Sequence, residues 1–176
     1  NHQGASYISI ITSTTTTIVA SFIFYEVLLS NSICTLTGAP WLHIEMIQIT
    51  WGLLFDGLTS AMLITITIVS TLVHIYSTAY MKQDPHLTKF LAYLSLFTFF
   101  MLVLVTSENF IQMLLGWEGV GFCSYLLITF WNTRIAANKA AIKAIFLNRI
   151  GDTGIFIGIL IIYKYTGTSS YFLLNT

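Results

Sequence analysis

The chain alternates between long apolar runs and short polar connections. Residues 57–81 and 90–107 contain no Asp, Glu, Lys or Arg, and residues 109–133 contain a single charged side chain, Glu118. Because about 20 mainly apolar residues form a helix long enough to cross a lipid bilayer, each of these runs predicts one spanning helix. The pattern is therefore typical of a membrane protein rather than a water-soluble domain.

Two further helices are predicted nearer the ends of the chain. Residues 4–29 are uncharged except for Glu26, and the hydroxyl-rich stretch 12–17 can be helical in lipid because each hydroxyl can bond back to the carbonyl one turn earlier. Residues 136–165 carry several charges and end in an apolar stretch that is too short to span the bilayer alone. We expect one long helix there, entering the membrane from a basic flank.

The connection at residues 30–55 has a different pattern. The turn signal TGAP, residues 37–40, leads into PWLHIEMIQITW, in which apolar and polar positions roughly alternate. Alternation of this kind is typical of a β-strand. We therefore predict either a β-hairpin or an irregular loop at about residues 34–52, outside the bilayer.

Together these elements predict an all-α fold: a polytopic bundle of about five transmembrane helices, with the short β segment outside the membrane. The expected helices cover about residues 4–29, 57–81, 88–106, 109–132 and 136–165. We expect residues 1–176 to form a single membrane domain. We also expect that domain to be an incomplete part of a larger subunit, because polar residues inside a five-helix bundle need partners.

Composition supports the membrane assignment. Of the 176 residues, 56% are hydrophobic and only 8% are charged, whereas soluble domains carry about 25% charged residues. The net charge is zero, so nothing indicates a nucleic-acid partner. Neither the two cysteines nor the four histidines stand at metal-ligand spacing, so we expect no metal site.

Basic residues are distributed unevenly among the connections. The connections at 82–89 and 132–143 contain Lys or Arg, whereas those at 30–55 and 106–109 contain neither. By the positive-inside rule, the two basic connections face the side on which the chain is synthesised and residues 30–55 face the other side. The strict alternation independently supports the predicted number of helices.

Glu118 is the main candidate for chemistry. It lies nine residues into its run, about 14 Å from one surface and about 20 Å from the other, close to the middle of the bilayer. An acidic side chain at that depth costs roughly 2.5–3.5 kcal/mol, and such residues normally face a bundle interior or a hydrated cavity. Desolvation favours the neutral acid and a nearby lysine favours the carboxylate, so movement of that lysine could load or release a proton. The alternative is a Glu that only packs helices together.

Small residues surround this carboxyl group. Gly116, Gly119 and Gly121 do not have the order of a dinucleotide-binding fingerprint, and no strand precedes them. We expect them to let a neighbouring helix or water approach Glu118. Gly154 and Gly158 similarly resemble a packing face of small residues.

The last predicted helix carries four further polar candidates. Arg149 and Asp152 are three residues apart and can form an ion pair with each other; alternatively, they belong to a polar chain that tunes the charge on Glu118. Lys139 and Lys143 are either flanking residues whose ammonium groups reach the surface or the lining of a proton entry route.

One histidine lies within a predicted span. His74 stands eight residues before Lys82, late in the helix at 57–81. It is either a packing residue or a proton relay, since imidazole changes its charge near physiological pH.

Two stretches carry motifs that resemble one family. Residues 84–131 contain GWEGVG and SYLLITFW, and residues 133–159 contain NRIGD. Together with WGLLFDGLTSAM at residues 51–62, they closely resemble subunit 5 of mitochondrial respiratory complex I, the NADH:ubiquinone oxidoreductase. That subunit is an antiporter-like membrane protein.

The resemblance implies a proton-translocating part of the H⁺-translocating NADH:ubiquinone reductase. It implies that Glu118 carries the proton and that Arg149 and Asp152 are polar channel or interface residues. No redox chemistry is expected in this chain, because NADH, FMN, Fe–S clusters and ubiquinone would bind to partner subunits. The implied location is the mitochondrial inner membrane, with the two basic connections on the matrix side and residues 30–55 on the intermembrane-space side.

The chain also departs from the family pattern. The family has a further helix before residue 4 and many after residue 163, and its essential lysines lie on those later helices. The expected partners are therefore lipid, other membrane-arm subunits, and a second chain or C-terminal part that supplies a membrane-embedded lysine. Two other readings stay open: the large subunit of a multi-subunit Na⁺/H⁺ antiporter, and a structural assembly subunit without its own proton path.

Overall fold

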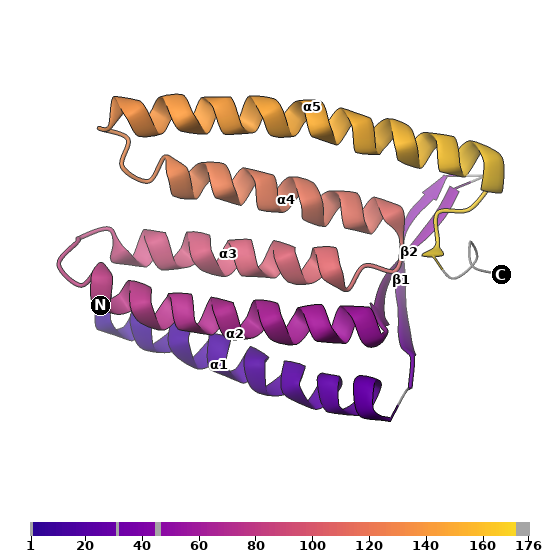
Figure 1. The fold of residues 1–176 in the computed structure, drawn as a ribbon, viewed down its shortest axis with the longest axis horizontal. Helices are drawn as coiled ribbons and strands as arrows, with labels where there is room; N and C mark the ends of the chain where they lie inside the picture. Colours follow the sequence, from indigo (N-terminus) through magenta and orange to yellow (C-terminus); the bar gives the residue numbers. More distant parts are fainter. Residues whose placement is uncertain (1, 31, 45–46, 172–176) are drawn as a thin grey trace.

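The computed structural model describes residues 2–30, 32–44 and 47–171, which form five long helices and a two-stranded sheet (Figure 1). The helices are α1 (His2–Phe24), α2 (Gly57–Tyr80), α3 (Leu87–Val105), α4 (Phe110–Ile128) and α5 (Ile135–Thr166). A π-helical turn, η1 (Tyr25–Leu29), continues α1, and the strands are β1 (Cys34–Ile44) and β2 (Ile47–Phe55).

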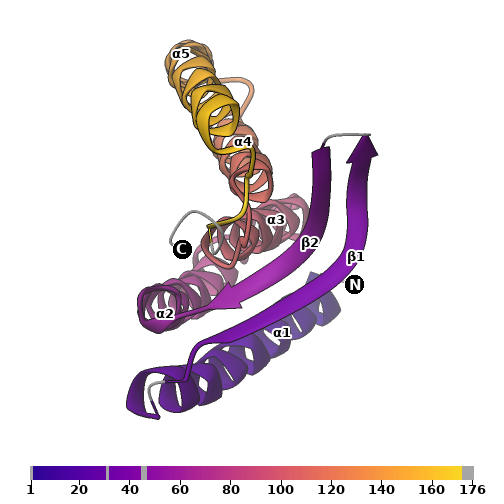
Figure 2. The same ribbon diagram turned by 90° about the vertical axis from the view of Figure 1, so that its right-hand side faces the viewer.

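Helices that follow one another in the chain lie side by side in space (Figures 1 and 2). α1 packs on α2 and also touches α3, whereas α5 stands at the far edge and packs mainly against α4. The edge position of α5 leaves most of its surface uncovered by the rest of the chain. Side chains that point from α4 into the α4–α5 contact are therefore only partly enclosed.

The five helices are each long and apolar enough to cross a membrane. Between 6% and 28% of the residues in their most apolar windows are buried within the chain, so much of their apolar surface is available to lipid. The predicted fold of about five spanning helices with a small β segment outside them is confirmed. When η1 is counted with α1, the largest boundary difference is at α4, which ends at Ile128, four residues before the predicted end.

The hydroxyl-rich centre of α1 is helical, as predicted. Thr12, Ser13 and Thr16 donate hydrogen bonds to backbone carbonyls three or four residues earlier. Thr17 makes the same kind of bond to the carbonyl of Ser13 and also reaches across to α2, where its hydroxyl lies 2.7 Å from the hydroxyl of Thr71. The hydroxyls thus satisfy each other and the backbone, which removes the cost of placing them in an apolar environment.

The segment between α1 and α2 is a β-hairpin, the first of the two predicted alternatives. β1 pairs antiparallel with β2, from Cys34 opposite Phe55 to Ile44 opposite Ile47. The register shifts on both sides of Pro40, which has no N–H to give to the ladder. β2 leads into α2 through Asp56, whose side chain accepts a hydrogen bond from the backbone N–H of Thr59 at 2.7 Å and caps the helix.

The hairpin crosses one end of the helices and is fastened to α4 (Figure 2). The fully buried Gln112 accepts a hydrogen bond from the N–H of Gly52 at 3.2 Å. Asn109, which precedes α4, donates to the carbonyl of Thr50 at 2.8 Å. These bonds fix the sheet against the start of α4.

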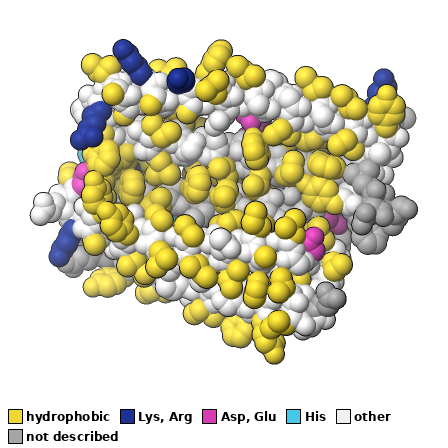
Figure 3. Space-filling view, in the orientation of Figure 1, with side chains coloured by type: hydrophobic (Ala, Val, Ile, Leu, Met, Phe, Trp, Pro, Cys, Tyr) yellow, Lys and Arg dark blue, Asp and Glu magenta, His cyan; other side chains and the backbone are white. Residues whose placement is uncertain are grey.

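The two basic connections lie together at the end of the helices opposite the hairpin (Figure 1). Most of the Lys and Arg side chains visible in Figure 3 gather at that end, and apolar side chains cover the middle of the same face. The basic residues that the sequence concentrates in two connections thus lie at one end of the molecule, and the hairpin, which has no Lys or Arg, lies at the other.

Candidate functional site

A groove of about 400 Å³ between α4 and α5 brings together the three main candidate residues. Glu118 comes from α4, and Arg149 and Asp152 come from α5. Phe100, Gly119 and Asn148 are also among the residues that line the groove. The site therefore combines two carboxylates, a guanidinium and an amide in a surrounding that is otherwise apolar.

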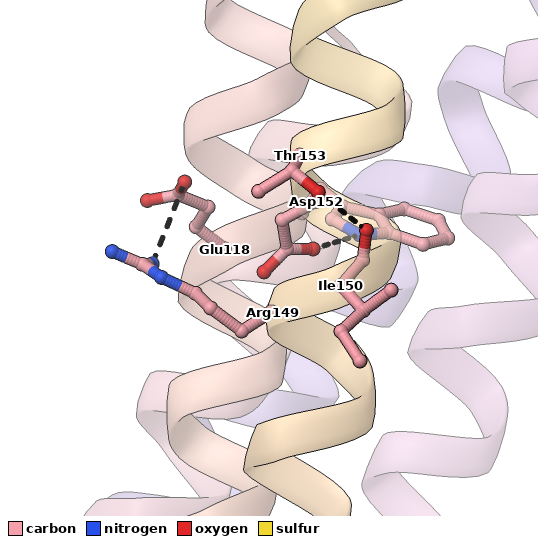
Figure 4. A network of polar contacts seen from close by, with 6 residues as sticks. Glu118, Arg149, Ile150, Asp152 and Thr153 are labelled. Atoms are coloured by element: carbon pink, nitrogen blue, oxygen red, sulfur yellow. Dashed lines mark hydrogen bonds and ion pairs between the residues drawn. The ribbon is translucent and has the colours of Figure 1, made fainter.

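Glu118 and Arg149 face each other across the groove (Figure 4). Their closest atoms, Glu118 Oε1 and Arg149 Nη1, are 3.9 Å apart. Within this chain the Glu118 side chain is 50% exposed and the Arg149 side chain 73% exposed. The contact is thus a loose ion pair without a close hydrogen bond, and each partner has surface left for a further neighbour.

Asp152 does not pair with Arg149 in the part of the chain that the structure describes. Its Oδ1 instead accepts a hydrogen bond from the indole N–H of Trp117 at 2.9 Å. The Arg149–Asp152 ion pair, one of the two alternatives from the sequence, is therefore not formed in this arrangement, although the three-residue spacing puts both on one face of α5. The physical reason is that α4 supplies a better-placed partner to each: an N–H donor to Asp152 and a carboxylate to Arg149.

Two glycines of α4 allow close contact with α3. A Cβ atom at Gly116 would lie 2.7 Å from the backbone of Leu104, and one at Gly119 would overlap the ring of Phe100. The expectation that small residues let a neighbouring helix approach is met at these two positions. Gly154 and Gly158, by contrast, have no described atom within 4 Å of the position a Cβ would take.

The other candidates lie outside the groove. Lys139 and Lys143 are exposed in the first turns of α5, on the side of the basic connections. His74 lies between α2 and α3, where its Nδ1 is 2.8 Å from the carbonyl oxygen of Ser70 and its Nε2 is 3.3 Å from the hydroxyl of Ser95. Its role and those of the two lysines stay predictions.

Two polar residues at the site were missed in the sequence: Asn148, which lines the groove, and Trp117, which bonds Asp152. Trp117 precedes Glu118 and Asn148 precedes Arg149, so both stood inside the quoted GWEGVG and NRIGD motifs. The Trp117–Asp152 bond forms only because α4 and α5 pack as neighbours, and spacing within one helix does not reveal this. A buried or lipid-depth indole usually needs a partner for its N–H, and that rule was the available signal.

The groove sets one acid, Glu118, beside one guanidinium, Arg149, close to the middle of α4. A carboxyl group can exchange a proton, and a guanidinium attracts a carboxylate. Among the described residues, no group of three or more His, Cys, Asp or Glu side chains is arranged to hold a metal ion.

Two sequence models of known families match the chain. Residues 41–91 match the family described as NADH-Ubiquinone oxidoreductase (complex I), chain 5 N-terminus. Residues 107–176 match the family described as NADH:quinone oxidoreductase/Mrp antiporter, TM. The second match contains the whole groove except Phe100.

Curated relatives point the same way. The chain is 54% identical over 160 residues to NADH-ubiquinone oxidoreductase chain 5 of Marchantia polymorpha, which covers 89% of this chain and 24% of the relative. It is 58% identical over 143 residues to the protein of the same name from Arabidopsis thaliana, covering 81% of this chain and 21% of the relative. The chain spans about a quarter of the length of these relatives.

A solved structure with the same fold is a chain of the membrane-bound sulfane sulfur reductase, an archaeal respiratory membrane complex. The TM-score is 0.75 at 21% sequence identity, over 94% of this chain and 33% of that chain. This likeness concerns the fold alone. The family matches and the identities above confirm the resemblance seen in the motifs, and the chain belongs to the family of NADH-ubiquinone oxidoreductase chain 5.

Proposed function

We propose that this chain is part of a proton-translocating membrane subunit of the NADH:ubiquinone oxidoreductase, and that Glu118 carries the proton. The observation that supports this most directly is the groove between α4 and α5. It sets a carboxylate opposite a guanidinium at 3.9 Å near the middle of a membrane-spanning helix. Ionisable residues at that depth are usually functional, because they are costly to place there.

The proposed proton step uses the distance between Glu118 and Arg149. While the guanidinium is close, its positive charge stabilises the Glu118 carboxylate. When the guanidinium withdraws, or when a lysine from another part of the subunit moves away, the carboxylate is left in an apolar surrounding and takes up a proton. The return of a positive charge releases that proton.

Asp152 and Trp117 set the position of Arg149 in this proposal. Asp152 is the other carboxylate that Arg149 can reach along its own helix face. The indole N–H of Trp117 occupies Asp152 Oδ1 and so favours pairing of Arg149 with Glu118. Trp117 is thus a positioning residue, while Glu118 is the group that holds the proton.

Protons would enter from the end with the basic connections. Lys143 lies six residues before Arg149, about 9 Å along α5, and Lys139 lies one further turn away. Their exposed ammonium groups would mark the route from the matrix side to the groove. The hairpin would then lie on the intermembrane-space side, in line with the positive-inside rule.

Electron transfer belongs to other subunits in this proposal. NADH, FMN, the Fe–S clusters and ubiquinone would be bound there, and this subunit would couple to quinone reduction through shifts of charge around Glu118. The mitochondrial inner membrane is the proposed location. Lipid, other membrane-arm subunits, and a lysine from a second chain or from further along the subunit would complete the surroundings of Glu118.

Two other functions make different predictions. A Na⁺/H⁺ antiporter subunit would support sodium-dependent growth without any linked NADH oxidation, and the description of the family matched at residues 107–176 includes such antiporters. A purely structural subunit would leave Glu118, Arg149 and Asp152 without a hydrated space. The names of the curated relatives support the complex I reading, and the polar groove supports a role in proton transfer.

The test is Glu118→Gln in the full subunit assembled in its complex. Gln keeps the shape of the side chain but cannot carry a proton, so we expect the proton translocation that passes through this subunit to be lost. The measurement is the number of protons moved per NADH oxidised in sealed membranes. Glu26→Gln is the matched control, because Glu26 is exposed at the other edge of the molecule.

The proposal fails if Glu118→Gln pumps as well as the unchanged enzyme at the same level of assembled complex. Glu26→Gln is expected to pump normally.

A further inference from the structure

His74 occupies a second buried polar position, away from the groove. The residue is 2% exposed and lies where α2 faces α3. Its Nδ1 is 2.8 Å from the carbonyl oxygen of Ser70, and its Nε2 is 3.3 Å from the hydroxyl oxygen of Ser95. The Ser70 hydroxyl oxygen is also 3.4 Å from Nδ1. Because a carbonyl only accepts hydrogen bonds, the shorter contact assigns a hydrogen to Nδ1 and leaves Nε2 facing Ser95.

Ser95 can serve either charge state of the ring. Its hydroxyl lies 2.9 Å from the carbonyl of Leu91 as well as close to His74. With a neutral ring, Ser95 donates its hydrogen to Nε2. With a charged ring, Nε2–H donates to the Ser95 oxygen, and Ser95 turns its hydrogen to the Leu91 carbonyl. Rotation of one hydroxyl therefore keeps every polar group paired when His74 changes its charge.

Two cavities lie beside this pair. His74 lines an apolar cavity of about 300 Å³ between α2 and α3. Ser95 lines a different cavity of about 240 Å³, which is half open and has a mainly apolar wall. Three helices contribute hydroxyl-bearing residues to it, among them Thr16, Thr67 and Thr98, and we call it the hydroxyl-lined cavity. A water molecule takes up about 30 Å³ in the liquid, so the hydroxyl-lined cavity has room for several.

His74 is the one ionisable side chain among the residues that line the two cavities. Among the described residues, no Asp, Glu, Lys or Arg from α1, α2, α3 or α4 lines either cavity, so no fixed charge faces the ring from those walls. His74 also stands six residues from the end of α2, about 9 Å from the basic connection. It is therefore nearer to that end of the molecule than to the hairpin.

We propose that His74 is a second proton-holding site, which exchanges its proton through Ser95 with water in the hydroxyl-lined cavity. In the transfer, the N–H bond at Nε2 breaks and the proton bonds to the Ser95 oxygen. The hydrogen that Ser95 already carried passes to a water molecule, which becomes hydronium. Ser95 is unchanged at the end, and His74 is neutral. The inference rests on the proposed function, because such a site serves a subunit that moves protons.

The experiment uses His74→Gln, Ser95→Ala and Ser95→Thr in the full subunit within its complex. Gln can still hydrogen-bond Ser95 but cannot hold a proton, so we expect the proton translocation that passes through this subunit to be lost. Ser95→Ala removes the relay hydroxyl and should give a similar loss, whereas Ser95→Thr keeps the hydroxyl and should restore translocation. His86→Gln is the matched control, since His86 is exposed in the connection before α3.

Normal translocation with His74→Gln would overturn the proposal. If that variant does not assemble, the Ser95 pair decides: equal translocation by the Ala and Thr variants would also overturn it. The outcome is separable from that of Glu118→Gln. If Glu118→Gln stops translocation and the His74 and Ser95 variants do not, the second site alone is wrong; if Glu118→Gln pumps normally, the proposed function itself is wrong.

Discussion

At the scale of single residues, the site depends on which carboxylate Arg149 contacts. The guanidinium can reach Glu118 on the neighbouring helix or Asp152 on its own helix face. The structure has the first contact, with Asp152 held by the indole N–H of Trp117. In the proposed function, a positive charge near Glu118 controls the uptake and release of its proton, so the choice between the two partners bears directly on that step.

Trp117→Phe should weaken this arrangement. Phe keeps a large aromatic ring in place but removes the N–H, which leaves Asp152 free to compete for Arg149. A hydrogen bond of this kind contributes about 0.5–1.5 kcal/mol, so we expect proton translocation per NADH to fall roughly two- to tenfold. The measurement is made in sealed membranes with the assembled complex.

Trp131→Phe is the control for that change, because Trp131 lies in the connection after α4 and outside the groove. Equal translocation by the Trp117 variant and the unchanged enzyme would show that the indole N–H does not position Arg149.

At the scale of elements, the close contact of α3 with α4 depends on a glycine. Gly116→Ala would put a Cβ 2.7 Å from the Leu104 backbone, and a helix backbone cannot yield as a flexible side chain can. Overpacking of this kind costs about 1–3 kcal/mol. We therefore expect the assembled complex to lose NADH:ubiquinone activity at a lower temperature than the unchanged enzyme does.

Gly57→Ala is the control for this prediction, because it makes the same substitution at a helix position with free space around it. Gly57 is exposed at the start of α2 with no described atom within 4 Å of the added Cβ, and Ala favours a helix over Gly by about 1 kcal/mol. A Gly116 variant as heat-resistant as the Gly57 variant would contradict the packing derived from the structure.

The helices and the hairpin could be predicted from the sequence for different reasons. Each helix needs only a long apolar run to satisfy its backbone in lipid, and the hairpin follows from the alternating residues after Pro40. The TGAP signal was not the turn of the hairpin, because residues 37–40 lie inside β1, where the register shifts next to Pro40. Which helices pack together could not be predicted. A helix that is apolar on all sides carries no stripe to mark its neighbour, so the edge position of α5 and the Trp117–Asp152 bond appear only in the structure.

The main residues of the site could be predicted from the sequence, but their contacts with other helices could not. Glu118 was evident because a lone charged residue in an apolar run is costly. Arg149, which contacts it in the structure, was a candidate because it is the arginine of the NRIGD motif. The true partner of Asp152 was hidden, because spacing within one helix indicates only contacts along that helix. The same limit applied to Ser95, which reaches His74 from another helix.

At the scale of the whole molecule, charge separates the two ends of the bundle and predicts its orientation. The two cysteines offer a direct measurement: Cys34 is exposed on β1, and Cys123 is buried in α4. A membrane-impermeant maleimide should label Cys34 when the intermembrane-space side faces the reagent and should not label it in inverted vesicles. Cys123 should stay unlabelled in both, because it is 0% exposed.

The reverse pattern is expected for a cysteine introduced at the other end. Gln83→Cys puts a thiol on the exposed, basic connection between α2 and α3 without removing a charge. Labelling of both thiols from the same side would contradict the predicted orientation.

The whole molecule also limits what the groove can do by itself. Glu118 and Arg149 are at least half exposed within this chain, and an ion pair so open is worth little. We expect the surrounding subunit to enclose them and to add a further positive charge. Enclosure would strengthen the effect of each charge on the proton of Glu118.

The most direct measurement is the infrared difference spectrum of the complex as NADH oxidation begins. If Glu118 carries the proton, a carboxylic acid C=O band that shifts in D₂O should change during turnover, should be absent from Glu118→Gln, and should persist in Glu26→Gln. A spectrum of Glu118→Gln identical in the carboxyl region to that of the unchanged enzyme would mean that Glu118 keeps one protonation state while the complex works, and it would contradict the proton-carrying role.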